Sequence, residues 1–252
     1  MKIDLTDKNI LVTGASRGIG KAIAEQLLRS GATVGAHYNA TPIKLNELSV
    51  EEITRLTMFK ADLTNTEETG QLLKQVVDRL GHLDVVINNA GLVVKSSIDD
   101  PLEEFIQKWQ TTMAVNLQAV GVLCNQAIQH FAKRHSGIII NISSRAAFRG
   151  DTADYLAYAA SKGGVVALTR SIARAYGKQG IVAFNIAPGF VKTNMADEFI
   201  KEYGAGFIKD DIALEEITQP QDLAPLVTLL ASGLANHATG GTFDVNAGSY
   251  VH

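Results

Sequence analysis

The sequence has little cysteine, little excess charge and no long hydrophobic run, and each scarcity excludes a class of protein. The single Cys124 cannot form an internal disulfide, and its apolar surroundings "VGVLCNQAI" are typical of a small core residue and not of a nucleophile. The formal net charge is −3 and the basic residues form no block or stripe, so we expect no nucleic-acid partner. The first residues, "MKIDLTDKNILVTG", contain neither a signal peptide nor a membrane span, and we expect a soluble cytoplasmic protein without a membrane partner.

Linkers, repeats and low-complexity tracts are also missing, and short apolar runs instead alternate with longer helical patterns. Strands are predicted at Ile10–Thr13, Thr33–Ala36, Thr57–Lys60, Val85–Asn88, Ile138–Ile142, Val182–Ala187 and Thr242–Val245. Helices are predicted at Ile19–Ser30, Thr66–Leu80, Leu102–Arg134, Ala157–Tyr176 and Gln221–Ala231, whereas the periodicity of Thr41–Arg55 is too weak to assign. The alternation predicts an α/β fold in a single domain, with a doubly wound, mostly parallel sheet of seven strands in three layers.

A glycine-rich stretch, "LVTGASRGIG", joins the first predicted strand to the first predicted helix. Gly14, Gly18 and Gly20 have no side chains to keep a pyrophosphate away from the backbone, and the helix that begins near Ile19 offers free N–H groups. An ordinary strand–helix turn is the alternative interpretation. Strand, loop and helix together favour a dinucleotide site.

The other strand ends agree with this hypothesis. Polar or glycine residues follow the next four strands in "AHYN", "KADL", "NNAG" and "NISS". Open α/β sheets bind ligands at the carboxyl ends of their strands. We therefore expect Asp62 to meet an adenine, and Asn89, Ala90 and Gly91 to allow a close approach of the backbone.

A tyrosine and a lysine stand four residues apart in the otherwise bland stretch "YAASK". Positions i and i+4 share one face of a helix, so Tyr158 and Lys162 point into the same space. Tyr155 lacks such a partner, because Ala159 stands four residues after it. An exposed tyrosine over a solvated lysine is the alternative to a functional pair.

In this order, "TGASRGIG", "NNAG", "MAVNLQAV", "NISS", "YAASK" and "PGFVKT" resemble the motifs of the short-chain dehydrogenase/reductase family. The resemblance covers nearly the whole chain. It implies a Rossmann-type dinucleotide-binding catalytic domain over residues 1–252, with a substrate lid at about 194–218. An amphipathic surface helix is the alternative for Asn194–Thr218.

The resemblance also implies four catalytic residues. Tyr158 would be the general acid/base, with Lys162 and the oxidised nicotinamide ring favouring its phenolate and Lys162 also binding the nicotinamide ribose. Ser144 would steady the substrate oxygen, whereas Ser143 points the other way if the strand alternates. At Asn116 we expect a kinked helix, whose freed backbone carbonyl holds a water that links Lys162 to solvent.

The cofactor expected from the resemblance is NADP(H) in preference to NAD(H). No acid follows the second strand in "AHYNAT", and Arg17 is placed to meet a 2′-phosphate. Tyr38 and Asn39 could instead serve an unphosphorylated ribose. No metal is implied, and the other expected cofactor contacts, besides Tyr158 and Lys162, are Gly14, Ser16, Gly18, Ile19, Gly20, Asp62, Leu63, Asn89, Ala90, Gly91, Pro188, Gly189, Val191 and Thr193.

The implied activity is hydride transfer between nicotinamide and a carbonyl or secondary alcohol. In general pattern the chain is most similar to 3-oxoacyl-[acyl-carrier-protein] reductases, so the substrate is a small molecule or an acyl thioester. A sugar, polyol, steroid or other small-alcohol dehydrogenase remains an alternative, and so does a regulatory module that binds a dinucleotide without turning it over. Two departures from the family pattern, Ala147 in a long loop before Tyr158 and "ALEE" at Ala213–Glu216, leave the substrate open.

Two further expectations concern partners. The adjacent Gly163 and Gly164 in a predicted helix indicate close backbone packing, and relatives assemble through this helix, so we expect a homotetramer or a dimer. The basic residues Lys133, Arg134 and His135 would receive an acidic acyl-carrier protein, or would simply be a solvated helix end.

Overall fold

One parallel sheet of seven strands forms the centre of the molecule. The computed structural model describes residues 3–45, 48–193, 206 and 210–251. The strands are β1 (Asn9–Val12), β2 (Thr33–Tyr38), β3 (Leu56–Lys60), β4 (Val85–Asn88), β5 (Gly137–Ile142), β6 (Ile181–Pro188) and β7 (Thr242–Val245). Their spatial order is β3-β2-β1-β4-β5-β6-β7, and every neighbouring pair is parallel. This confirms the predicted doubly wound sheet, with boundaries that differ by one or two residues.

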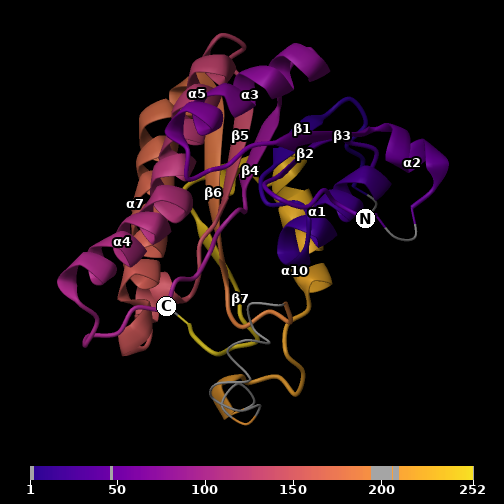
Figure 1. The fold of residues 1–252 in the computed structure, drawn as a ribbon. Coiled ribbons are helices and arrows are strands. Elements are labelled where there is room, and N and C mark those ends of the chain that lie inside the picture. Colours follow the sequence, from indigo (N-terminus) through magenta and orange to yellow (C-terminus); the bar gives the residue numbers. More distant parts are fainter. Residues whose placement is uncertain (1–2, 46–47, 194–205, 207–209, 252) are drawn as a thin grey trace.

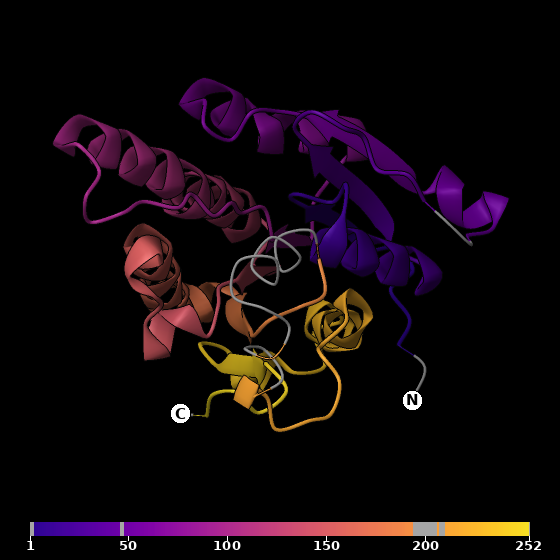
Figure 2. The same cartoon turned by 60° about the horizontal axis from the view of Figure 1, so that its bottom comes forward.

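Helices cover both faces of the sheet (Figure 1). The longer ones are α1 (Gly18–Arg29), α3 (Thr66–Leu80), α4 (Leu102–Met113), α5 (Ala119–Ala132), α7 (Leu156–Tyr176) and α10 (Pro220–Ala231). Helices α1 and α10 pack together on one face, and α3, α5 and α7 cover the other. Figure 2 shows the sheet from its carboxyl edge, with α4 and α7 on one side and α1 and α10 on the other.

The strands are apolar without alternation because each face of the sheet has its own core. In β1, Ile10 and Val12 join the core under α1 and α10, whereas Leu11 points to the core under α3 and α5. Cys124 is in this second core and 1% exposed, as its sequence context predicts. Burial raises the pKa of its thiol to about 12, so the thiol does not act as a nucleophile near neutral pH.

The prediction of one helical stretch over Leu102–Arg134 is wrong in one respect. The structure has two α-helices there, α4 and α5, separated by a π-helical turn at Ala114–Gln118. π-helical turns of this kind occur often at functional sites.

Two short α-helices among the described residues were not predicted. One, α2 (Val50–Thr54), lies in the unassigned segment and begins with a capping box between Ser49 and Glu52. The other, α6 (Ala146–Arg149), lies in the loop that follows β5.

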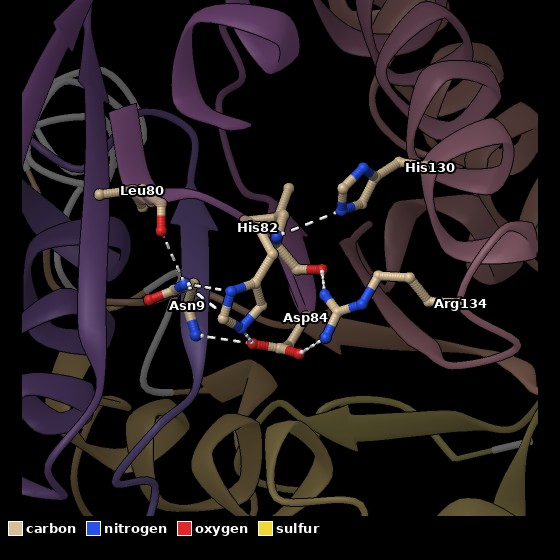
Figure 3. A network of polar contacts seen from close by, with 7 residues as sticks. Asn9, Leu80, His82, Asp84, His130 and Arg134 are labelled. Carbon is tan, nitrogen blue, oxygen red and sulfur yellow. Dashed lines mark hydrogen bonds and ion pairs between the residues drawn. The ribbon is translucent and has the colours of Figure 1, made fainter. Parts of the chain in front are cut away.

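A polar network closes the amino edge of the sheet, at the start of β1 and β4 (Figure 3). The Asp84 carboxylate accepts a hydrogen bond from the backbone N–H of Asn9 at 2.9 Å and contacts Arg134 at 3.4 Å and His82 at 3.1 Å. Arg134 also donates to the Leu83 carbonyl at 3.0 Å. These contacts fix the beginnings of two central strands.

Among the described residues, none of the helices combines the length and the apolar character that a bilayer crossing requires.

Candidate active site

The glycine loop between β1 and α1 has the backbone that the sequence predicted. Gly14 and Gly18 have φ angles of +64° and +54°, in the region that disfavours other residues. A Cβ on Gly14 would lie 2.8 Å from Ala90 Cα, and one on Gly20 would lie 2.3 Å from the Gly14 carbonyl oxygen. The loop is thus folded tightly against the end of β4.

Three side chains hold this loop in place. The Thr13 hydroxyl accepts hydrogen bonds from the backbone N–H groups of Asn89 and Ala90, each at 3.0 Å. The Asn89 amide donates to the carbonyls of Thr13 and Gly14 at 2.9 and 3.1 Å. His37 Nδ1 accepts the Gly14 N–H at 3.1 Å. Asn89, predicted as a cofactor contact, therefore also positions the loop.

His37 and Thr13 were not predicted as site residues. His37 Nε2 lies 3.0 Å from the Ala61 carbonyl oxygen, so the imidazole spans from β2 to the end of β3. Burial lowers the pKa of His37, and the neutral ring with its proton on Nε2 satisfies both contacts. The absence of an acid after β2 was noticed in the sequence, but nothing there indicated that His37 turns inward.

The start of α1 offers a fit for a phosphate group. Arg17 is the exposed N-cap residue, no side chain caps the helix, and its first turn contains no acid. The first backbone N–H groups of a helix have no partner within it, and the helix dipole favours an anion there. The methyl of Thr193 lies next to this turn, since a Cβ on Gly18 would be 3.1 Å from it. These residues fit the dinucleotide that the sequence predicts.

The catalytic candidates meet at the carboxyl ends of β5 and β4. Ser144 follows β5 and lies beside the Tyr158 hydroxyl, from α7, whose pKa it holds down against the effect of burial. Ser143 turns toward β6, where its hydroxyl donates to the Ile186 carbonyl at 3.0 Å and accepts from Asn185 at 2.8 Å. The geometry thus supports Ser144 as the serine beside Tyr158.

Lys162 is buried, and its Nζ donates to the Ile142 carbonyl at 3.0 Å. Nζ lies 5.7 Å from the centre of the Tyr158 ring, so the two side chains share one face of α7 as predicted. Burial lowers the pKa of Lys162 to about 8 and raises that of Tyr158 to about 12, although the Ser144 hydrogen bond opposes the rise. In the chain alone, burial thus dominates the pKa of Tyr158, and the expected joint effect of Lys162 and the oxidised nicotinamide ring stays a prediction.

Asn116 lies in the π-helical turn, where the sequence predicted a kink. Its amide forms a pair of hydrogen bonds with the backbone of Leu92, each 2.9 Å long, and donates to Ser161 Oγ at 3.3 Å. Ser161 in turn donates to the Tyr158 carbonyl at 2.7 Å. The Asn116 side chain therefore connects the segment after β4 to α7.

A cavity of about 550 Å³ opens at this edge of the sheet. The predicted site residues that line it are Ile19, Asn89, Gly91, Ser144, Tyr158, Lys162, Pro188, Gly189, Val191 and Thr193. The remaining predicted cofactor residues, and Asn116, are not in its wall. The predicted lid lies largely outside the described residues.

Charged residues in the cavity wall were missed by sequence reasoning. Lys95, Arg145, Arg149 and Asp151 line the cavity together with Lys162. Arg145 directly follows Ser144, and α6 places Arg149 one turn further on. The spacing of the two arginines in "SRAAFR" was the available signal.

The basic residues proposed for carrier docking are not at this cavity. Arg134 belongs to the network at the amino edge of the sheet, and Lys133 and His135 are its sequence neighbours (Figure 3). The cavity is at the carboxyl edge.

The chain matches the family model for short chain dehydrogenase over residues 8–204. It is 36% identical to a 3-oxoacyl-[acyl-carrier-protein] reductase FabG of Staphylococcus aureus, over 97% of this chain and 98% of that protein. It is 33% identical to the same-named reductase of Vibrio cholerae, over 99% of this chain and 100% of that protein.

Two solved structures share the fold over nearly the whole chain. A putative NAD(P)-dependent gluconate 5-dehydrogenase from Beutenbergia cavernae, with NADP bound at low occupancy, has a TM-score of 0.87 at 28% identity and is covered at 99% in both chains. An NADPH-dependent 3-quinuclidinone reductase from Rhodotorula rubra has a TM-score of 0.86 at 28% identity, over 98% of this chain and 93% of that one. The family match over most of the chain and the relatives above 30% identity show that this protein belongs to the short-chain dehydrogenase/reductase family.

Proposed function

We propose that this oxidoreductase uses NADP(H) to interconvert a ketone and a secondary alcohol in the cavity at the carboxyl edge of the sheet. The observation that carries the proposal is the placement of Ser144, Tyr158 and Lys162 in the wall of one cavity that also reaches Ile19 at the start of α1. A module that only binds a dinucleotide would not need these three side chains together.

Each of the three side chains has a distinct task. Tyr158 gives its proton to the substrate oxygen in reduction and takes it back in oxidation. Ser144 donates a hydrogen bond to the same oxygen, where negative charge develops. Lys162, held by Ile142, presents its remaining N–H groups toward the ribose and Tyr158. NADP(H), when bound, supplies or accepts the hydride, and its oxidised ring adds the positive charge that Tyr158 lacks in the chain alone.

NADP(H) is proposed over NAD(H) because of Arg17 and the residues after β2. Arg17 is exposed at the open start of α1, and no acid stands at the end of β2, in "AHYNAT", to repel a 2′-phosphate. A charge-assisted hydrogen bond to the phosphate contributes about 1.5–3 kcal/mol, so we expect a preference of roughly 10- to 150-fold in kcat/KM.

The measurement is kcat/KM for NADPH and NADH in the wild type and in Arg17→Ala. Equal use of the two cofactors by the wild type would refute the preference. A ratio that does not fall in Arg17→Ala would remove the role of Arg17.

Two substrate classes are candidates. Curated relatives are named as reductases of 3-oxoacyl groups on an acyl-carrier protein, which supports a 3-oxoacyl thioester. The cavity wall favours the second class, a small polar ketone or alcohol of the sugar type. Four of its lining side chains, Lys95, Arg145, Arg149 and Lys162, are basic, which suits a polar or anionic substrate, although apolar side chains line the cavity as well.

Oxidation of NADPH in the presence of ketones, aldehydes and acyl thioesters tests the proposal. Turnover of acyl thioesters above all others would support the first class, and turnover of small polar ketones the second. Binding of NADPH without its oxidation by any carbonyl compound would contradict both classes and support a regulatory module that binds the dinucleotide without turning it over.

A further inference from the structure

The charges in the cavity wall are unbalanced. Among the described residues that line the cavity, Lys95, Arg145, Arg149 and Lys162 are basic and Asp151 alone is acidic. This excess of positive charge occurs in a chain whose formal net charge is −3. Lys162 belongs to the reaction machinery, but the other three cations have no task in hydride transfer.

Arg145 is the cation closest in sequence to the reaction centre. It follows Ser144 directly, its residue is 8% exposed, and its guanidinium group lies 4.6 Å from the centre of the Phe190 ring. The ring holds the guanidinium plane by a cation–π contact. Burying a cation costs free energy unless an anion compensates it, and burial lowers the pKa of Arg145 accordingly.

Asp211 supplies part of the negative charge that compensates Arg145. It lies in the described segment that begins at residue 210. Its carboxylate contacts Arg145 Nη1, and Arg149 Nη1 donates to both of its oxygens at 2.9 and 3.1 Å. One carboxylate therefore serves two guanidinium groups. Asp211 does not itself line the cavity.

Arg145 and Arg149 line the cavity that contains Ser144, and their guanidinium groups converge on one carboxylate, so the same pair can bind the carboxylate of a substrate. The planar guanidinium group binds a carboxylate through two parallel hydrogen bonds, and a second arginine completes the charge balance. Resting on the proposed function, we infer that the ketone substrate carries a carboxylate, which Arg145 and Arg149 bind and for which Asp211 competes. The two arginines are then specificity-determining residues for an oxo acid and its hydroxy acid.

Matched pairs of probes test the inference in the intact enzyme with NADPH. The probes are 4-oxopentanoate and 5-oxohexanoate, each compared with its methyl ester, which keeps the ketone and removes the charge. We expect a ratio of kcat/KM for acid over ester of roughly 10- to 100-fold, the size of a charge-assisted contact. A ratio near one, with the esters turned over, would overturn the inference and leave the proposed function intact. Absence of NADPH oxidation with any ketone would overturn both.

Three variants distinguish substrate binding by the two arginines from a purely structural role, in which they only hold Asp211 in place. Arg149 is partly exposed, so Arg149→Gln should fold, and it should lower the acid-to-ester ratio at least tenfold through KM for the acid. Asp211→Asn removes the competing anion and should raise the ratio. If Arg145 and Arg149 only fasten Asp211, the ratio stays the same in both variants, and the inference is wrong. Lys74→Gln is the matched control, because it removes one positive charge from the exposed face of α3 and should leave the ratio unchanged.

Discussion

At the scale of single residues, Tyr158 and Tyr155 can be separated experimentally. Both line the cavity, and Tyr158 lies beside Ser144 and shares one face of α7 with Lys162. We expect Tyr158→Phe to lower kcat by 10²- to 10⁴-fold and to leave NADPH binding almost unchanged, because only a proton donor is lost. Steady-state kinetics and a fluorescence titration with NADPH measure the two effects.

Tyr155→Phe is the comparison for that experiment. It removes a hydroxyl from the same cavity but not the acid, so its kcat should fall far less. A Tyr158→Phe enzyme that keeps more than about a tenth of the wild-type kcat would contradict the assignment of Tyr158 as the general acid/base.

Lys162 is expected to reduce the stability of the enzyme that it serves. Its pKa falls from 10.5 to about 8 on folding, so the folded state binds the lysine proton less readily than the unfolded state. The resulting loss of stability is complete below pH 8 and disappears above pH 10.5. Because one pKa unit corresponds to about 1.4 kcal/mol, this loss of stability is on the order of 3 kcal/mol. The hydrogen bond from Lys162 to the Ile142 carbonyl reduces it.

Urea unfolding of cofactor-stripped Lys162→Met should therefore show a higher free energy of unfolding than the wild type at pH 7, and a smaller gain at pH 10. Lys74→Met, at an exposed position, is the control and should show no such difference. The same gain at both pH values would contradict burial as the cause.

At the scale of elements, the strands were predictable because their sequence signal is local. In the run Val85–Asn88, three apolar residues are followed by a polar one, and strands of a parallel sheet that is covered on both faces have this pattern. The tyrosine–lysine pair was predictable for a similar reason, because a helix fixes which residues share a face. The short helix α2 could have been found as well, since Ser49 and Glu52 form a recognisable capping box.

What the sequence did not reveal depends on contacts between distant segments. The family resemblance predicted a kink at Asn116, but it did not predict the hydrogen bonds between Asn116 and Leu92 that accompany the π-helical turn at Ala114–Gln118. The task of His37 depends on Gly14 and Ala61 meeting at its ring. The arrangement of Arg145 and Arg149 depends likewise on Asp211, which only the fold brings beside them.

The two glycines of α7 differ in what surrounds them. A Cβ on Gly164 would lie 2.8 Å from a Leu117 methyl in the π-helical turn, whereas one on Gly163 would be 3.9 Å from its nearest neighbour, the Ala147 carbonyl. Replacing glycine by alanine inside a helix stabilises the helix by about 0.8–1 kcal/mol. In the cofactor-free protein, Gly163→Ala should raise the stability of the folded chain by this amount. Gly164→Ala should raise it less or lower it, because Leu117 must move.

Thermal unfolding of the two variants measures the difference. An equal gain for both would show that Leu117 yields freely and that Gly164 is not needed for packing inside the chain. A loss at Gly163 would instead point to packing against another subunit.

At the scale of the whole molecule, assembly remains a prediction. Helices α4 and α7 lie side by side, and apolar side chains are exposed on them, namely Leu102, Ile106 and Leu156. Together with the glycine pair, they favour a dimer or a tetramer. Light scattering at micromolar concentration should give a mass near two or four times 27.0 kDa, and a value near 27.0 kDa would contradict this expectation.

The polar network of Asn9, Asp84 and Arg134 lies at the edge of the sheet opposite the cavity (Figure 3). The two ends of the molecule can therefore change independently. One end anchors the strands, and the other presents segments such as residues 145–155, several of which line the cavity beside Tyr158. Loops of this kind can be exchanged, by evolution or by design, without disturbing the anchors, which makes the chain a scaffold on which new specificities can be built.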